Sequence, residues 1–348
     1  MPATNFAAIR RKLLHWYQRN KRDLPWRRTR DPYAIWIAET MLQQTRVETA
    51  LPYYEKFLRA FPTIQALRRA PLERILRAWA GLGYYRRAEN LKKAACQISC
   101  NHGGQIPREY EKLRGLAGVG DYTAGAILSI AFQQRYPAVD GNARRVLGRL
   151  LDLGDEKELF AKAAALVPRS RPGDFNQAIM ELGATICITK TPRCNQCPLS
   201  AECSARTSQE LTLSSSRQKQ IKFKDVVWPL AIVRFRGKVL LRRRGANGLL
   251  ARLWELPGAE APRLDRVVAS LRRELAELGY TRIARRPIAE IRHSITNRRI
   301  RAPIYLVECP IAAALRLGGK RWRWVAPDAG QNHAVSSMTV KALRTLTR

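Results

Sequence analysis

The sequence predicts two domains, an all-α domain followed by an α+β domain. Apolar residues recur at helical spacing through the first 203 residues, whereas alternating, strand-like patterns appear only near the end of the chain. A polar, serine-rich segment with almost no residues suited to a core separates the two patterns. We therefore expect a helical domain at 1–205, a linker at 206–225 and an α+β domain at 226–348.

Helical patterns account for nearly all of the first domain. A clear helix start is Asp31-Pro32, because aspartate can cap a helix N-terminus and proline suits the first turn. Two more helices surround Gly118-Val119-Gly120, the first ending at Leu116-Ala117 and the second beginning near Tyr122. Apolar residues also recur at helical spacing in Phe6–Tyr17, Tyr33–Gln44, Ala50–Phe61, Leu72–Ala80 and Ala88–Ile98.

Strands and a single helix account for the second domain. Two strand-like runs flank Arg236-Gly237, which is typical of a hairpin. A helical pattern follows over Pro262–Leu278 and is expected to end at Gly279. The expected strands are Leu230–Phe235, Lys238–Arg242, Ile288–Ile295 and Ile300–Val307.

The formal net charge of +35 indicates an anionic partner. Nucleic acid is the first candidate and an anionic membrane surface the second, although a high charge can also be a general surface property. No apolar run reaches the roughly 18 residues needed to span a bilayer. The amphipathic N-terminus lacks the apolar core of a signal peptide. We therefore expect a soluble cytoplasmic protein without a membrane role.

Four cysteines lie close together near the end of the first domain. Cys187, Cys194, Cys197 and Cys203 have the spacing C-x6-C-x2-C-x5-C. Thiolates are soft ligands that suit zinc or an iron–sulfur cluster. Structural zinc sites usually contain two C-x2-C pairs, whereas this loop over residues 187–203 has one, which favours a [4Fe-4S] cluster. Two disulfides are the alternative, but nothing in the sequence indicates an oxidising compartment.

The segment Gly118-Val119-Gly120 suits an anion site between two helices. Glycines around a small apolar residue let the backbone turn sharply and present N–H groups at a helix N-terminus, where a DNA phosphate can bind. Alone the pattern is weak, because glycine ends many helices. It gains weight from Val139-Asp140-Gly141-Asn142 and the cysteine loop, which follow in order.

This order of motifs resembles the helix–hairpin–helix DNA glycosylases of the endonuclease III superfamily, which carry a [4Fe-4S] cluster. Three further segments resemble the adenine glycosylase branch, of MutY type, and Gly248–Gly258 resembles its Nudix-like C-terminal domain. The three segments are Leu24–Arg27, Ile35–Thr45 and Gly81–Arg86. The resemblance implies base excision repair of double-stranded DNA by a nucleoid-associated monomer, acting on adenine opposite 8-oxoguanine or guanine. Protein partners do not follow from the sequence.

Two acidic residues are candidates for the chemistry. Glu39 lies in an otherwise apolar and amide-rich helix, where desolvation would raise its pKa and let it act as an acid near neutral pH. The family resemblance implies that it protonates adenine at N7. Asp140 precedes a probable helix at Asn142–Leu151, so a capping role is the simpler interpretation. The resemblance implies instead that its carboxylate stabilises or traps an oxocarbenium ion.

Tyr122 distinguishes between two chemistries. Related enzymes that also cleave the strand have a lysine at this position, which forms a Schiff base with the sugar. A tyrosine cannot, so we expect a monofunctional enzyme in which the phenol hydrogen-bonds Asp140 or the adenine edge. The target base must be flipped out of the duplex, which leaves a gap to fill. Further residues matched to the family's catalytic, base and DNA contacts are Asn142, Trp26, Arg27, Gln43, Gln44, Tyr84, Gly118, Val119, Gly120, Thr296 and Asn297.

The predicted lesion-reading loop departs from the family pattern. The family commonly has H-x-F-[ST]-H, whereas this chain has His293-Ser294-Ile295-Thr296-Asn297. Thr296 and Asn297 can still offer hydrogen bonds to an oxidised guanine, but the flat ring is lost at Ile295. Two alternatives remain: a sister glycosylase of the same fold that removes mismatched thymine or another base, and a non-catalytic iron–sulfur protein that binds DNA or senses redox state.

Overall fold

The computed structural model describes residues 5–207, 222–278, 282–328 and 333–346. The chain separates into two compact units. The first comprises Met1–Arg69 and Glu89–Lys219, and the second comprises Ala70–Ala88 and Gln220–Arg348. Most of the predicted linker, residues 208–221, lies outside the described residues, and the boundaries at 205 and 225 stay predictions.

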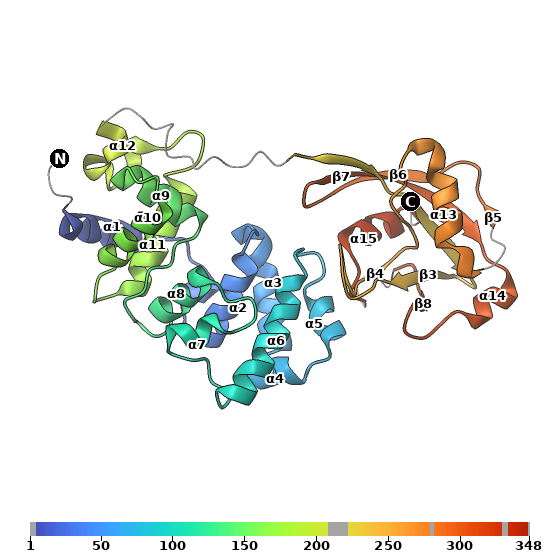
Figure 1. Ribbon diagram of the computed structural model, residues 1–348, viewed down its shortest axis with the longest axis horizontal. Coiled ribbons are helices and arrows are strands. Elements are labelled where there is room, and N and C mark those ends of the chain that lie inside the picture. Colours follow the sequence, from blue (N-terminus) through green and yellow to red (C-terminus); the bar gives the residue numbers. More distant parts are fainter. Residues whose placement is uncertain (1–4, 208–221, 279–281, 329–332, 347–348) are drawn as a thin grey trace. The chain divides into compact units, whose positions relative to one another are not determined.

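Helices make up the first unit, as expected (Figure 1). Short 3-10 turns at Pro25–Arg27, Cys194–Gln196 and Ser200–Glu202 connect some of them. Helix α5 (Leu72–Ala78) belongs to the second unit, and α6 (Arg86–Asn101) begins just before the boundary between the two. The other helices are α1 (Phe6–Asn20), α2 (Pro32–Leu42), α3 (Val47–Ala60), α4 (Ile64–Arg69), α7 (Tyr110–Arg114), α8 (Asp121–Ile130), α9 (Gly141–Leu151), α10 (Glu156–Leu166), α11 (Pro172–Thr185) and α12 (Ser204–Thr207).

Helix α2 is the most deeply buried element around the site. Asp31 caps it by accepting a hydrogen bond from the Tyr33 backbone N–H, and Pro32 occupies its first turn, as predicted. Every residue from Tyr33 to Met41 is buried. A helix that is apolar on all sides must lie inside the domain, so Glu39 is carried into the interior with it.

A hydrophobic core is shared by α1, α9, α10 and α11. The cysteine loop packs against this core. The largest members of the core include Tyr17, Leu147 and Phe175. The axes of α9 and α11 approach closely because Gly183 has no side chain. A Cβ atom there would lie 2.7 Å from the Cβ of Asn142.

The helical hairpin differs slightly from the prediction. Its first helix ends at Arg114 rather than at Leu116-Ala117. The amide of Gln97 explains the earlier end, because it donates to the Gly115 carbonyl at 3.2 Å and accepts from the Ala117 N–H at 2.8 Å. These bonds replace those of another helical turn. The second helix begins at Asp121, near the predicted Tyr122.

A mixed β-sheet forms the centre of the second unit, in the order β1-β7-β2-β3-β4. Strands β1 and β2 run parallel to β7, and β2 and β3 form the predicted hairpin. Strands β5 and β6 pair antiparallel with β7, and β8 pairs antiparallel with β3. The strands are β1 (Lys224–Val227), β2 (Leu230–Phe235), β3 (Lys238–Arg243), β4 (Trp254–Glu255), β5 (Arg282–Ile283), β6 (Ala289–Ile295), β7 (Arg298–Glu308) and β8 (Trp322–Val325).

Helices pack on both faces of this sheet. Side chains of β2 alternate between the faces, so Leu230 and Ile232 contact the core beneath α15 (Ser337–Leu343), whereas Ala231 and Val233 contact α13 (Val267–Glu274). The helix predicted over Pro262–Leu278 is thus α13 with a 3-10 turn on either side, at Leu264–Arg266 and Ala276–Leu278. Gly279 lies outside the described residues. A further helix, α14, spans Ile311–Arg316.

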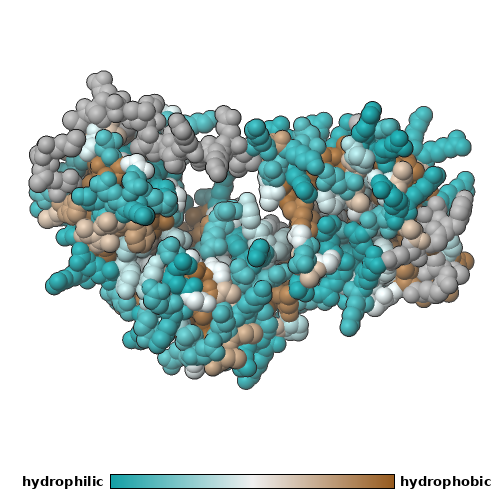
Figure 2. All heavy atoms as spheres, viewed as in Figure 1, coloured by the Kyte–Doolittle hydropathy of each residue, from teal (hydrophilic) through white to brown (hydrophobic). Residues whose placement is uncertain are grey.

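The surface matches the strongly basic composition. Hydrophilic side chains cover most of the face seen in Figure 2, with smaller apolar areas between them. None of the helices in the described part of the chain has the length and hydropathy needed to cross a membrane.

Candidate active site

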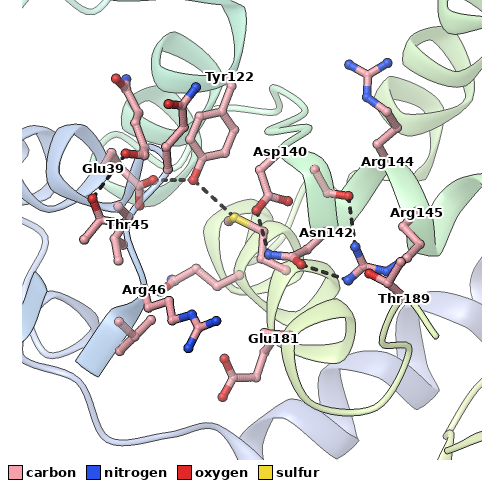
Figure 3. A pocket seen from close by; sticks show the side chains of 18 of the residues that line it. Glu39, Thr45, Arg46, Tyr122, Asp140, Asn142, Arg144, Arg145, Glu181 and Thr189 are labelled. Carbon is pink, nitrogen blue, oxygen red and sulfur yellow. Dashed lines mark hydrogen bonds between the residues drawn. The ribbon is translucent and has the colours of Figure 1, made fainter. Parts of the chain in front are cut away.

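A cavity of about 1270 Å³ opens in the first unit. Its walls come from the 3-10 turn at Pro25–Arg27 and from α2, α8, α9 and α11 (Figure 3). The cavity is lined by the predicted catalytic residues, which lie up to about a hundred residues apart in the sequence. They are Glu39, Tyr122, Asp140 and Asn142, joined by Trp26, Arg27, Gln43 and Gln44.

Glu39 has the environment expected of an acid. Its side chain reaches the cavity wall from buried α2, and the residue is only 4% exposed. Burial raises the pKa of Glu39 to about 7, the Tyr122 hydrogen bond opposes this, and the nearby Asp140 carboxylate reinforces it. At neutral pH a substantial fraction of Glu39 is therefore protonated and able to donate.

Tyr122 contacts Glu39 rather than Asp140, which corrects one of the two partners predicted for it. Its phenol donates a hydrogen bond to Oε2 of Glu39 and also lies 3.4 Å from Sδ of Met180 (Figure 3). Burial and then the Glu39 charge raise the pKa of Tyr122 well above its usual value. The phenol thus stays protonated and can stabilise the Glu39 carboxylate once that residue has lost its proton.

Asp140 caps α9, as the simpler interpretation predicted, and it also lines the cavity. Its Oδ1 accepts from the Ala143 N–H at 2.7 Å and caps α9, which leaves Oδ2 to accept from Nδ2 of Asn142 at 3.0 Å. Burial raises the pKa of Asp140, and these two hydrogen bonds act against that rise. Capping therefore fixes the carboxylate at the cavity wall and helps to keep it ionised.

Arg145 connects Asn142, the partner of this carboxylate, to the cysteine loop. Arg145 donates from Nη2 to Oδ1 of Asn142 at 2.8 Å and to the Gly183 carbonyl at 2.7 Å. Its Nε donates to the carbonyl of Cys187 at 2.8 Å. The start of the loop is thereby tied to the residue that orients Asp140.

Glu181 is a cavity residue that the sequence analysis missed. Its carboxylate is 1% exposed and accepts hydrogen bonds from Arg22 and from Nη2 of Arg27, the latter at 2.7 Å. Burial opposes ionisation, but the bonds from both arginines outweigh it and lower the pKa of Glu181 to about 2. The positive charge of Arg27 also acts to lower the pKa of Glu39. Because Arg27 is paired with Glu181, its effect on the pKa of Glu39 is limited.

Trp26, Gln43 and Gln44 line the cavity in different ways. Trp26 is 5% exposed, and its ring packs edge-on against that of Tyr54 with the ring centres 5.2 Å apart. It is therefore a core residue with one side on the cavity. Gln43 donates from Nε2 to the Thr123 hydroxyl at 3.1 Å. Gln44 has a φ of 56°, a left-handed conformation that costs energy for a residue other than glycine.

The glycine turn has the predicted geometry. Gly118 has a φ of 79°, and a Cβ atom there would lie 2.7 Å from Cβ of Asn90, so only glycine fits. Val119 is buried, and its carbonyl accepts from Nη1 of Arg114 at 3.0 Å. Gly120 occupies the N-cap position of α8 and offers no side-chain cap, which leaves the helix terminus open to an external anion.

The four clustered cysteines converge on a small cavity of their own. Cys187, Cys194, Cys197 and Cys203 all line it, together with Arg149, whose Nη1 lies 3.5 Å from Sγ of Cys187. No disulfide forms among the described cysteines, which are free thiols. No three metal-binding side chains of the described chain are grouped closely enough for a single ion. A four-iron cluster takes one thiolate at each iron, and this donor set fits it.

The predicted lesion-reading residues lie in the second unit. Thr296 and Asn297 form the two-residue turn between β6 and β7, in which Ile295 pairs with Arg298. Both are exposed, and Thr296 has a φ of 54°. Ile295 is partly buried against the α15 core. Tyr84, also in this unit, is 48% exposed with a φ of 47°.

Two family models match the chain, one in its N-terminal half and one in its C-terminal part. The model of the HhH-GPD superfamily of base excision DNA repair proteins matches residues 37–169, and that of the NUDIX domain matches residues 229–345. The adenine DNA glycosylase of Homo sapiens is 34% identical over 97% of this chain and 73% of that protein. The adenine DNA glycosylase of Rattus norvegicus is 36% identical over 97% of this chain and 77% of that protein.

A solved thermostable thymine-DNA glycosylase is also similar, with a TM-score of 0.56 and 32% identity over 58% of this chain and 97% of that one. The predicted two-part architecture, a helix–hairpin–helix domain followed by a Nudix-like domain, is therefore confirmed. The human and rat relatives align over nearly the whole chain, including the Nudix-like part. The chain belongs to the adenine DNA glycosylase family.

Proposed function

We propose that this DNA glycosylase hydrolyses the N-glycosidic bond of adenine mispaired with 8-oxoguanine or guanine in double-stranded DNA. The observation that carries the proposal is that two carboxyl groups, that of buried Glu39 and that of partly buried Asp140, line the same cavity. Glu39 is poised to be protonated near pH 7, and Asp140 is held by donors that favour its anion. The family relatives named for adenine support the choice of base.

The two groups divide the chemistry between them. Glu39 donates its proton to N7 of the flipped adenine, and the bond between C1′ and N9 then breaks with its electron pair leaving on the base. The sugar becomes an oxocarbenium ion, which the Asp140 carboxylate stabilises or traps. Water adds to C1′, and the proton that it loses restores Glu39. Meanwhile the Tyr122 phenol stabilises the Glu39 anion through its hydrogen bond.

The reaction stops at the abasic site. A lyase step requires an amine that forms a Schiff base with the sugar, and Tyr122 occupies the place of that lysine. No lysine is among the described residues that line the cavity. Borohydride should therefore trap little covalent enzyme–DNA adduct, and the strand should stay intact until alkali or heat is applied. Efficient trapping would count against this assignment.

We further propose that Cys187, Cys194, Cys197 and Cys203 hold a [4Fe-4S] cluster. Their shared cavity and the chemistry of four thiols support it. When bound, the cluster supplies a rigid crosslink for the loop, and Arg145 carries that order to Asn142. Protein prepared anaerobically should be brown and contain iron; stoichiometric zinc without iron would contradict the proposal. We also propose a cytoplasmic, nucleoid-associated monomer.

Removal of thymine is the second candidate, because the thymine-DNA glycosylase shares 32% identity with this chain. It aligns with 58% of this chain, and buried Glu39 suits a purine with a basic N7. A base-release panel over all mismatches, with 8-oxoguanine included, separates the two. We expect release of adenine opposite 8-oxoguanine and guanine. Release of thymine with adenine untouched would overturn the assignment, and binding without any release would indicate a non-catalytic protein.

A further inference from the structure

An exposed aromatic ring lies beside the predicted lesion-reading turn. Phe223 immediately precedes β1 and is 49% exposed. The guanidinium carbon of Arg299 lies 4.6 Å from the centre of its ring. Arg299 is itself exposed near the start of β7. A flat hydrocarbon ring and a flat cation thus lie together on an accessible part of the sheet.

The backbone on both sides of Phe223 is fixed to this turn. The Lys224 N–H donates to the Asn297 carbonyl at 2.8 Å, and Nδ2 of Asn297 lies 3.4 Å from the Lys222 carbonyl. From Lys224 onward β1 pairs with β7 in parallel, beginning with Lys224 opposite Arg298. The phenyl ring therefore has a defined place next to Thr296 and Asn297.

The ring also lies on a different face from Ile295. Inward and outward residues alternate along β6, and both His293 and Ile295 lie on the inward face. Ile295 packs against the α15 core. Along β7, Arg299 is exposed while Ile300 is buried in the same core. Since Phe223 contacts Arg299, it belongs to the outward side. A ring placed at residue 295 would meet the core of this unit, whereas the ring of Phe223 is free to meet a ligand.

The chemistry of this pair fits a nucleobase. Bases stack on exposed aromatic rings and on guanidinium planes, and they do so most readily where nearby cations attract the phosphate backbone. Arg292 and Arg301 lie opposite each other on the outward face of β6 and β7, where Arg301 pairs with Glu290 at 2.8 Å. The polar groups of Thr296 and Asn297 can contact the edge of a base whose face rests on the ring. The exposed residues Ile288, Ile311 and Leu315 of this unit are aliphatic and offer no such plane, and the exposed ring of Tyr84 belongs to the segment Ala70–Ala88 and not to the strands beside the turn.

We propose that Phe223 and Arg299 form a stacking site for the purine opposite the target adenine, beside the Thr296–Asn297 turn. The site takes a purine ring of duplex DNA. This inference rests on the proposed function, because it assumes that the second unit contacts the opposite base.

The test measures binding by full-length protein carrying Glu39→Gln, so that the adenine is not released. Two duplexes are compared, one with a purine opposite the adenine and one with a tetrahydrofuran abasic analogue there. The purine-to-analogue ratio of the two association constants reports stacking on the opposite base. Phe223→Leu should lower this ratio about tenfold, in line with the loss of one base–aromatic stack. Phe223→Trp should preserve it.

Two matched variants distinguish stacking from general effects. Phe160→Leu removes another exposed phenyl ring, 37% accessible on α10, and should leave the ratio unchanged. Arg299→Lys keeps the positive charge but loses the flat guanidinium, so it should lower the ratio without weakening binding to a fully paired duplex. If Phe223→Leu leaves the purine-to-analogue ratio at its starting value, or if Phe160→Leu lowers it equally, the stacking site is refuted.

The proposed function fails in a different way. With Glu39 intact, the absence of single-turnover release of adenine opposite both 8-oxoguanine and guanine would refute it. That result leaves the binding ratio, and hence the stacking site, to be judged separately. A preference that survives Phe223→Leu together with an unchanged binding ratio would keep the proposed function and overturn the inference.

Discussion

The catalytic cavity of the first unit and the β6–β7 turn of the second unit are built on opposite principles. In the cavity Glu39, Asp140 and Glu181 each have at least one partner that fixes the carboxylate. In the turn Thr296 and Asn297 are exposed and bond mainly to neighbouring backbone. Buried groups gain strongly perturbed pKa values, which suits bond breaking. Exposed groups keep ordinary chemistry and can change without loss of the fold, which suits recognition.

The largest expected effect comes from Glu39→Gln. An amide keeps the size of the side chain and can still accept from Tyr122, but it cannot supply a proton. Single-turnover release of adenine should fall by roughly 10²–10⁴-fold while DNA binding is retained. Glu156→Gln is the matched control, because Glu156 also lines the cavity but its side chain is 74% exposed. Near wild-type release by the Glu39 variant would exclude Glu39 as the acid.

Asp140→Asn should give the next largest loss. Asparagine is a good N-cap, so its carbonyl can still accept from the Ala143 N–H and α9 should keep its start. What disappears is the charge beside the developing cation, and removal of such a group commonly costs about 10²–10³-fold in rate. The measurement pairs single-turnover kinetics with thermal unfolding. A drop in rate matched by a collapse in stability would assign Asp140 to capping alone.

Glu39 should also reveal itself in the pH dependence of stability. Its pKa rises from 4.5 to about 7 on folding, so between these values the folded state keeps a proton that the unfolded chain releases. The contribution of Glu39 to the free energy of unfolding is therefore largest below pH 4.5 and falls as the pH rises toward 7. Glu39→Gln lacks this titration and should be more stable than wild type above pH 7, by up to about 3 kcal/mol. Parallel stability curves for the two proteins would show that folding does not change the pKa of Glu39.

The same contrast explains what the sequence could predict. The apolar pattern of its helix predicted the burial of Glu39, and the spacing of the cysteines predicted that they share a site. Both predictions depend on local sequence patterns. Glu181 was missed because its partners Arg22 and Arg27 lie more than 150 residues earlier in the chain. The contact of Tyr122 with Glu39 depends on how α2 and α8 pack, which periodicity alone does not fix. Phe223 was overlooked because it falls within the predicted linker, and its contact with Arg299 depends on the pairing of β1 with β7, which the sequence pattern did not predict.

The smallest expected effect is in the turn itself. Asn297→Ala removes the amide that reaches the Lys222 carbonyl and the group best placed to bond a base edge. One hydrogen bond is worth about 0.5–1.5 kcal/mol, so the rate ratio for adenine opposite 8-oxoguanine over guanine should fall by roughly two- to tenfold. The rate opposite guanine should hardly change, because Glu39 and Asp140 are untouched. Ser294→Ala is a suitable control, since Ser294 is exposed on β6 close to the turn. If Asn297→Ala slows both substrates equally, the turn supports binding in general and does not discriminate between the opposite bases.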